Sequence, residues 1–283
     1  MKKLLGIILS LAMVLLYIVP LKATTSIIAV DVEFEDILED EEGYLWKEGE
    51  PIIPSIIVKY KGQDLVEGTD YEVSYKDNTD LGIGYVVLTG IGAYSDVKEC
   101  KFRIKKYLYE TLVLEKAKFV YDNEVHKPLV KGTKSEPHLP TYWFKRTYYS
   151  YDKANEEFKN VGRYFVEAEF IDDCIYFGRC YGEYMIVPKG TSIKSLRAGR
   201  KKFTVKWKKQ RTQTTGYEIK YSLKKNMKKA KTVTVKKNTT TKKTIKKLKR
   251  RKTYYVRVRT YKLDNKGKKI CSSWSKRKHV RVR

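Results

Sequence analysis

Histidine is scarce in this chain of 283 residues, which has only three: His126, His138 and His279. Each stands apart from the others, beside Lys or Pro. The sequence contains no G-x-S-x-G, H-E-x-x-H or phosphate-binding loop, the motifs that carry much hydrolase and nucleotide chemistry. The adjacent acids 156–157 and 172–173 would point to opposite sides of a strand, so neither forms a glycosidase pair. We therefore expect no enzyme and no cofactor.

Cysteine is also rare, with four residues: Cys100, Cys174, Cys180 and Cys271. No C-x-x-C spacing occurs, which argues against a zinc site or another metal site. Cys174 and Cys180 flank a short segment and could be joined by a disulfide that clips one loop, since export from the cell would permit oxidation. The alternative is that all four are small buried residues.

Acidic residues are almost absent from the last third of the chain. Residues 188–283 hold 37 Lys and Arg but only Glu218 and Asp264, which leaves +35, whereas residues 1–187 sum to −8. Small domains usually carry a net charge of roughly 2–8. This asymmetry predicts a polyanionic partner, self-association through opposite charge, or both. The alternative is that Lys only keeps a secreted domain soluble.

Residues 1–23 resemble a secretory signal peptide. Lys2 and Lys3 precede an apolar run over residues 4–19, Pro20 follows, and Ala23 offers a small residue for cleavage. The apolar run is slightly short of the ~20 residues of a spanning helix, which favours cleavage over a retained anchor. We expect a secreted, cell-surface protein without a transmembrane span in the mature chain.

Residues 24–106 contain short strand-like runs separated by turn signals. Examples are Tyr71–Tyr75, with alternating apolar and polar positions, and the preceding Glu67-Gly68-Thr69-Asp70. The sequence of this region is similar to a bacterial surface Ig-like repeat. The similarity lies in L-V-E-G-T-D-Y-E-V-S-Y, then G-I-G-Y-V-V-L-T-G-I-G-A-Y-S, then C-K-F-R-I. This resemblance implies a β-sandwich.

Residues 107–187 resemble a second, divergent copy of residues 24–106. Residues 121–128 echo residues 46–54, residues 160–164 echo residues 80–84, and residues 182–186 echo residues 101–104. The spacing between matching segments drifts, so the second copy carries insertions. Near-equal units in tandem favour an extended array over an enzyme.

Residues 188–283 alternate apolar and polar side chains over several strands. The pattern F-T-V-K-W, then G-Y-E-I-K-Y-S, then Y-Y-V-R-V-R, then S-S-W-S, resembles the fibronectin type III family. Leu248 lies six residues before Tyr254, the spacing of a tyrosine corner, in which a Tyr hydroxyl bonds back to the preceding turn. Arg250 stands where that family usually has Pro. The fold class expected for the whole chain is all-β, with two Ig-like sandwiches and one fibronectin type III-like sandwich.

The candidate site is centred on the strand expected over residues 254–261. Tyr254, Val256, Val258 and Thr260 should point into the core, and the residues between them should point outward. In a sandwich of the resembled family, neighbouring strands would extend this outward face. The expected polyanion-binding residues are Lys220, Tyr255, Arg257, Arg259, Tyr261, Arg281 and Arg283. Arginine forks beside aromatic rings suit phosphates and sulfates. The alternative is that Trp274 stacks on Arg257 or Arg259 as a purely structural cation–π contact.

The sequence therefore predicts a non-catalytic bacterial binding or adhesion protein. An acidic Ig-like spacer would present a basic domain that docks on an anionic cell-wall polymer or another acidic surface. One alternative is an adhesin or accessory module that binds a protein or a glycan. A weaker alternative is binding of extracellular nucleic acid, because charge and aromatic rings alternate on the same face.

Overall fold

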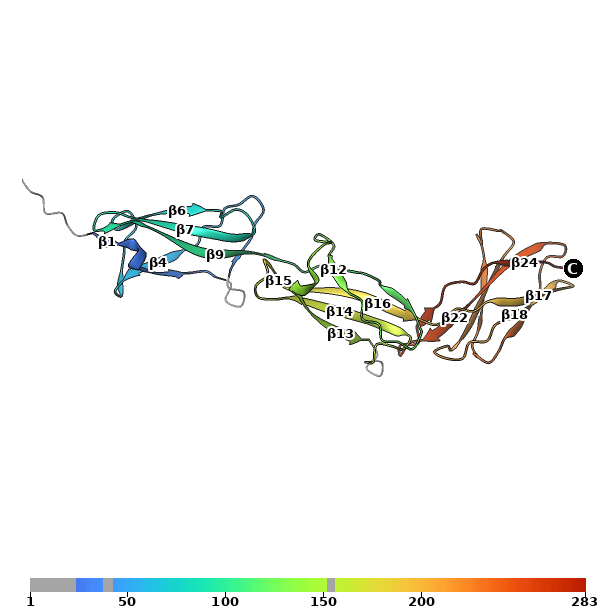
Figure 1. Ribbon diagram of the computed structural model, residues 1–283. Helices are drawn as coiled ribbons and strands as arrows, with labels where there is room; N and C mark the ends of the chain where they lie inside the picture. The colour runs from blue at the N-terminus through green and yellow to red at the C-terminus, as the bar shows by residue number, and fades with distance from the viewer. Residues whose placement is uncertain (1–23, 38–42, 152–155) are drawn as a thin grey trace, which may run out of the picture. The chain divides into compact units, whose positions relative to one another are not determined.

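The computed structural model describes residues 24–37, 43–151 and 156–283, and the expected signal peptide over residues 1–23 lies outside these ranges. The chain divides into two compact units, one ending at Lys106 and one beginning at Tyr107. Both are built almost wholly of β-strands (Figure 1). None of the helices in the described ranges is both long and apolar enough to cross a membrane.

The first unit is a sandwich of two main sheets. One sheet has the order β2-β4-β5, and the other has the order β3-β9-β7-β6, in which β3 is parallel to β9. Val58, Val86 and Ile104 lie fully buried between them. The elements are β1 (Thr25–Ser26), η1 (Ile27–Ala29), β2 (Asp31–Phe34), β3 (Tyr44–Leu45), β4 (Ile56–Tyr60), β5 (Gln63–Asp64), β6 (Tyr71–Lys76), β7 (Gly82–Gly90), β8 (Tyr94–Ser95) and β9 (Val97–Tyr107).

The second unit begins with residues 107–187, here called the middle sandwich. Its main sheet has the order β11-β16-β14-β13, and β10 and β12 form a separate two-stranded sheet. Tyr164, Tyr184 and Ile186 form the centre of its core, where the two Tyr rings stack 5.2 Å apart. The elements are β10 (Leu112–Leu114), β11 (Lys118–Val120), β12 (Val130–Thr133), η2 (Thr141–Trp143), β13 (Phe144–Ser150), β14 (Gly162–Phe170), β15 (Tyr176–Phe177) and β16 (Arg179–Val187).

The main sheets of the first unit and of the middle sandwich share one topology. In each, an antiparallel hairpin (β6-β7 or β13-β14) is followed by a long antiparallel strand (β9 or β16). In each, a short edge strand (β3 or β11) then pairs in parallel with that long strand. A second copy of the first domain would give this match. The assignment of both to the Ig-like family stays a prediction.

Residues 188–283, here called the basic sandwich, complete the second unit. One sheet has the order β17-β18-β21, and the other has the order β20-β19-β22-β23 with β24 also paired to β22. Phe203, Val205, Trp207, Tyr217 and Val258 lie buried between the sheets. The strands are β17 (Ile193–Gly199), β18 (Lys202–Trp207), β19 (Gly216–Ser222), β20 (Lys231–Val235), β21 (Lys242–Ile245), β22 (Thr253–Leu263), β23 (Lys269–Cys271) and β24 (Lys278–Arg281).

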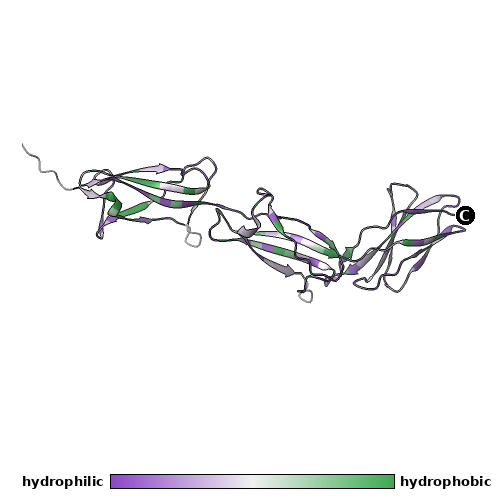
Figure 2. Ribbon diagram, in the orientation of Figure 1, coloured by the Kyte–Doolittle hydropathy of each residue, from purple (hydrophilic) through white to green (hydrophobic). Residues whose placement is uncertain are grey.

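Alternation explains why these segments form strands with one buried face. Along β22, Tyr254, Val256, Val258 and Thr260 are buried and most of the residues between them are partly exposed, as predicted. Apolar and polar positions likewise alternate along many strands in Figure 2. The tyrosine corner is also confirmed, because the Tyr254 hydroxyl accepts a hydrogen bond from the Lys249 N–H at 3.0 Å. This bond fixes the turn that leads into β22.

The middle and basic sandwiches share contacts within the second unit. Ile270 of β23 packs in the core cluster of the middle sandwich. Gln213 donates a hydrogen bond to Asn160 at 2.7 Å and accepts one from the Val161 N–H. The expected boundary after residue 187 therefore falls inside one compact unit.

Candidate functional site

The sheet around β22 brings together most of the predicted polyanion-binding residues. Lys220 of β19 lies opposite Arg257, and Arg281 of β24 lies opposite Thr253. Opposite residues share a face, and side chains two positions apart along a strand share it as well. Lys220, Tyr255, Arg257 and Arg281 therefore occupy one outward face, here called the β22 face.

An acid that alternation alone did not identify as a partner lies on the β22 face. Glu218 is opposite Arg259, is only 6% exposed, and forms ion pairs of 2.7 Å with both Arg259 and Lys269. Burial by itself would raise the pKa of Glu218, but the hydrogen bonds from Lys269 and Arg259 outweigh it and hold the pKa below its usual value. Arg259 is thus neutralised within the domain.

Arg259 makes the cation–π contact with Trp274 that was the structural alternative to ligand binding. Its guanidinium lies 4.3 Å from the centre of the Trp274 ring, and the Lys220 ammonium lies 5.6 Å from the same ring. Such contacts contribute about 0.5–2 kcal/mol each. Arg257 makes no such contact with Trp274, and its Nε is buried without a hydrogen-bond partner.

Two of the predicted residues differ from the others in burial or position. Tyr261 is buried at 2% exposure, because its ring fills the space opposite Gly216, which has no side chain of its own. Arg283 lies beyond β24, where its backbone bonds to Gly199 and Lys201 at the end of the other sheet. The outward position predicted for Tyr261 is therefore wrong, whereas Arg283 is exposed past the end of β24. Polyanion binding by the predicted residues stays a prediction.

The opposite sheet carries a basic face without any acid, here called the β18 face. Lys202, Thr204 and Lys206 alternate with buried residues along β18 and are at least partly exposed. Pairing adds Arg197 of β17 opposite Thr204, and Lys242 of β21 opposite Lys206. Like charges that lie directly opposite on a sheet destabilise it. The Lys206–Lys242 pair therefore favours an anion between or above the two strands.

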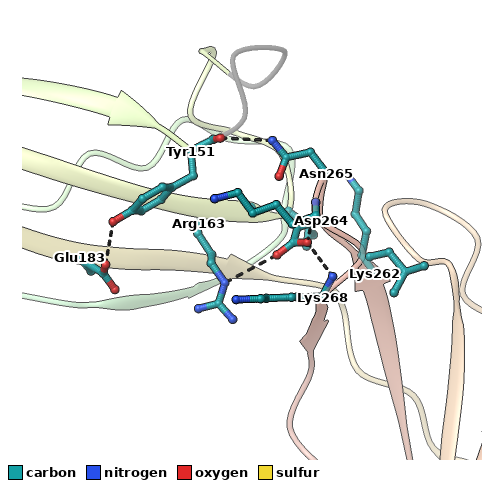
Figure 3. Close-up of a pocket in the computed structure, with 11 residues that line it drawn as sticks. Tyr151, Arg163, Glu183, Lys262, Asp264, Asn265 and Lys268 are labelled. Carbon is teal, nitrogen blue, oxygen red and sulfur yellow. Dashed lines mark hydrogen bonds and ion pairs between the residues drawn. The ribbon is translucent and has the colours of Figure 1, made fainter.

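A pocket of about 340 Å³ opens where the middle and basic sandwiches meet (Figure 3). Its polar groups bond largely to each other. Asp264 lies 3.9 Å from the Arg163 Nε and accepts from the Lys268 N–H at 2.7 Å. Asn265 donates to the Tyr151 carbonyl oxygen at 3.2 Å. Two of these contacts, Arg163–Asp264 and Tyr151–Asn265, join the two sandwiches.

The cysteines are thiols, and the expected disulfide clip between Cys174 and Cys180 is not formed. The Tyr176 N–H donates to the Cys174 sulfur at 3.5 Å, and the Cys180 sulfur donates to the Leu108 carbonyl at 3.4 Å. Both side chains are buried, and burial raises the pKa of the Cys180 thiol. The alternative of small buried residues describes these two positions. No cluster of three His, Cys, Asp or Glu that could hold a metal ion occurs within the described ranges.

A match to a family model supports the fold of the basic sandwich. The family model of the fibronectin type III domain matches residues 188–271. A solved structure of the fn3 domain of human collagen alpha-1(XX) chain is 17% identical, covers 33% of this chain and 84% of its own, and has a TM-score of 0.28. The chicken CNTN1 FN1-FN3 domains are 11% identical over 89% of this chain and 98% of theirs, with a TM-score of 0.31.

Domains A168-A170 from titin are similar at 12% identity, over 89% of this chain and 98% of theirs, with a TM-score of 0.27. Similarity at this level indicates neither a partner nor an activity. No curated protein matches the chain. Fibronectin type III domains are typically non-catalytic structural or binding modules, and no enzyme family is identified.

Sequence reasoning missed the partner of Arg259 and the β18 face. The alternation of Lys202, Thr204 and Lys206 was visible in the sequence, but their convergence with Lys242 depends on strand pairing. Glu218 was visible as a lone acid, yet its burial depends on Lys269, which is 51 residues away. Neither contact follows from local spacing.

Proposed function

We propose that this chain is a non-catalytic, exported binding protein whose basic sandwich docks on an anionic polymer of the cell envelope. The observation that carries the proposal is the β18 face and its surroundings. Both acids of residues 188–283 are already engaged, Glu218 with Arg259 and Lys269, and Asp264 with Arg163. Every lysine of the β18 face therefore lacks a carboxylate of its own domain.

A polymer suits this surface better than a small ligand does. The β18 face is an open sheet face, and its charges lie in rows set by strand pairing, such as Lys206 opposite Lys242. A chain of phosphates can follow such rows and release condensed counterions, which gives binding that weakens as salt rises. The first unit and the middle sandwich, with their acidic excess, would then act as a spacer that the same polymer repels.

The test is retention of the mature chain, residues 24–283, on purified anionic cell-wall polymer over a salt series. The variant K202Q/K206Q/K242Q removes three charges from the β18 face. The control K101Q/K131Q/K145Q removes three charges from exposed positions outside the basic sandwich, so the net charge is matched. A third variant, K220Q/R257Q/R281Q, tests the β22 face.

We expect retention to fall steeply with salt for the natural chain and to weaken for the β18-face variant but not for the control. The slope of log affinity against log salt should decrease by about 2, because each phosphate that a lysine no longer neutralises removes roughly 0.7 from it. Equal loss for the β22-face variant would move the site to that face. Retention that is indifferent to salt, or equal in all variants, would refute electrostatic docking. Competition by DNA distinguishes nucleic acid from wall polymer as the partner.

A second candidate function, glycan binding, is favoured by the outer face of the middle sandwich. Tyr149 and Phe165 stack there at 4.7 Å, and Tyr151 packs against Phe165 at 5.2 Å. The Tyr151 hydroxyl donates to Glu183 at 2.7 Å, and this bond raises the pKa of Tyr151. Flat apolar rings beside a carboxylate acceptor suit a sugar ring with its hydroxyl groups.

The glycan candidate is tested with neutral oligosaccharides at high salt, where docking by charge is suppressed. Tyr149→Ala should abolish any binding, whereas Tyr142→Ala, which removes a Tyr that is 73% exposed and outside this stack, should not. No binding of neutral sugars by the natural chain would discard this candidate and leave the rings as cross-strand stabilisers of the sheet.

A further inference from the structure

One end of the basic sandwich contains a pocket of about 390 Å³ with seven lysines in its wall. Four come from the β19–β20 connection and the start of β20, at positions 224–231, and three come from the β21–β22 connection, at positions 246–249. Tyr221, Leu248 and Tyr254 also line it. Two separate lysine-rich turns thus converge on one concave site that includes aromatic rings.

Both turns are fixed by hydrogen bonds, so the pocket is built before any ligand arrives. Ser222 donates to the Lys228 carbonyl at 2.7 Å and accepts from the Lys224 N–H at 3.0 Å. In the other turn, the Lys249 N–H donates to the Tyr254 hydroxyl at 3.0 Å, which is the tyrosine corner. Preorganised walls reduce the ordering cost of binding.

The charge of the pocket is not compensated from within the domain. No acid lines it, and all of residues 188–283 are described. The carboxylate of Glu218 is held by Arg259 and Lys269, and that of Asp264 by Arg163. Several ammonium groups around one concavity repel each other unless an anion lies between them, and a concave low-dielectric wall focuses their field.

We propose that this pocket binds a compact, multiply charged phosphate group, such as the phosphorylated end of the polymer or a branch from it. The inference rests on the proposed function and adds a specific site to the diffuse β18 face. Lysine ammonium groups act as point charges with three donors each, so several of them can surround one phosphate cluster. The aromatic and aliphatic lining provides contact for the carbon skeleton that carries the phosphate.

The pocket differs from the β18 face in the ligand it should prefer. On an open face, affinity depends mainly on how many contacts the anion makes, so a long anion binds more tightly than a short one. A pocket with convergent charges should bind a short, dense anion at a stoichiometry of one, even at salt concentrations that release a polymer from the face. This difference makes the two sites separable by experiment.

The experiment titrates inorganic tripolyphosphate into the mature chain, residues 24–283, by calorimetry at constant ionic strength, with sulfate as the comparison anion. The pocket variant is K229Q/K247Q, which removes one charge from each turn. The matched control is K202Q/K206Q, which removes two charges from the β18 face. The variant K229R/K247R retains the charge, and circular dichroism checks that all of them fold.

We expect one tripolyphosphate per chain, bound at least about tenfold more tightly than sulfate. K229Q/K247Q should weaken this binding about tenfold or more, K202Q/K206Q by less than about twofold, and K229R/K247R should restore it. Equal losses in the two Gln variants, or several weak sites per chain, would overturn the pocket and leave only a diffuse ion atmosphere.

The same variants on the polymer column separate the two proposals. Retention of the polymer without tripolyphosphate binding refutes the pocket but not the docking function. Failure of both refutes the docking function as well.

Discussion

Glu218 should be the acid on which the stability of the basic sandwich depends most. It is 6% exposed and is the carboxylate that both Arg259 and Lys269 contact on the β22 face. Hydrogen bonds to charged groups contribute about 1.5–3 kcal/mol each. Glu218→Gln weakens two of them and leaves two cations facing each other.

The magnitude follows from the exposure of the partners. Removing one member of a fully buried ion pair costs about 3–5 kcal/mol. Here the Arg259 and Lys269 side chains are 27% and 36% exposed, so water can partly rehydrate them after the change. We therefore expect a loss of about 2–4 kcal/mol in the unfolding free energy of this sandwich, about 1 kcal/mol below the range for a fully buried pair.

Native-state hydrogen exchange of the mature chain is the suitable assay, because it resolves β19, β22 and β23 separately from the first unit. A loss of about 2–4 kcal/mol corresponds to exchange that is roughly thirty to several hundred times faster in those strands. The control is Glu169→Gln, which removes a carboxylate bonded to Arg179 at 2.9 Å with both side chains about half exposed. Exposed pairs contribute only about 0–1 kcal/mol.

The pH dependence gives a second readout of the same carboxylate. Because the folded pKa of Glu218 is lowered, its contribution is fully present above the unfolded value of about 4.3. The contribution is lost as the pH falls through the lower folded pKa. Glu218→Gln should therefore flatten the acid limb of the stability profile. An effect no larger than that of Glu169→Gln, with an unchanged acid limb, would refute the reasoning.

Three further results are expected. Tyr254→Phe should cost about 1 kcal/mol in thermal unfolding, because it removes the acceptor for the Lys249 N–H; no change would mean that water replaces that bond. Gly216→Ala should destabilise the basic sandwich by more than about 2 kcal/mol in urea unfolding, because its Cβ would lie 2.1 Å from the Val235 carbonyl oxygen; near-neutral behaviour would mean that the strand shifts freely. Burial, with lesser contributions from nearby acids, raises the pKa of Tyr44 to about 12, so the first unit should lose stability between about pH 10 and 12; ultraviolet titration that shows Tyr44 ionising near 10 would contradict this.

Local alternation was enough to predict the all-β class and the core of β22. Tyr254, Val256 and Val258 are buried because a strand turns successive side chains to opposite faces, and that rule needs only the sequence. The tyrosine corner also followed from spacing, since the bond joins residues five apart. Features that depend on close neighbours along the chain can therefore be predicted from the sequence alone.

The same rule failed at Tyr261, where Thr260 and Tyr261 are both buried. The reason lies across the sheet: Gly216 stands opposite Tyr261 and leaves space that the ring fills. No pattern within β22 contains this information, because the register between β19 and β22 is fixed by pairing over about 40 residues. For a residue in a strand, a prediction that its side chain is exposed is therefore less reliable than a prediction that it is buried.

The disulfide clip failed for a related reason. Cys174 and Cys180 are six residues apart, but Cys180 belongs to β16 and its thiol meets the Leu108 carbonyl, 72 residues earlier in the chain. Cys174 meets the Tyr176 N–H instead. Short separation in sequence does not bring two side chains together when the strand that carries one of them turns its sulfur elsewhere.

Charge composition predicts a partner class, and the structure adds where the two acids of the basic sandwich lie. With 37 basic residues and two acids, the basic sandwich could have placed Glu218 and Asp264 anywhere on its surface. Instead one is enclosed by Arg259 and Lys269, and the other faces Arg163 of the middle sandwich. Both acids are thus used in internal contacts, so neither competes with a ligand at the β18 face or at the lysine pocket. On the β22 face, by contrast, Glu218 neutralises Arg259, although Lys220, Arg257 and Arg281 have no such carboxylate.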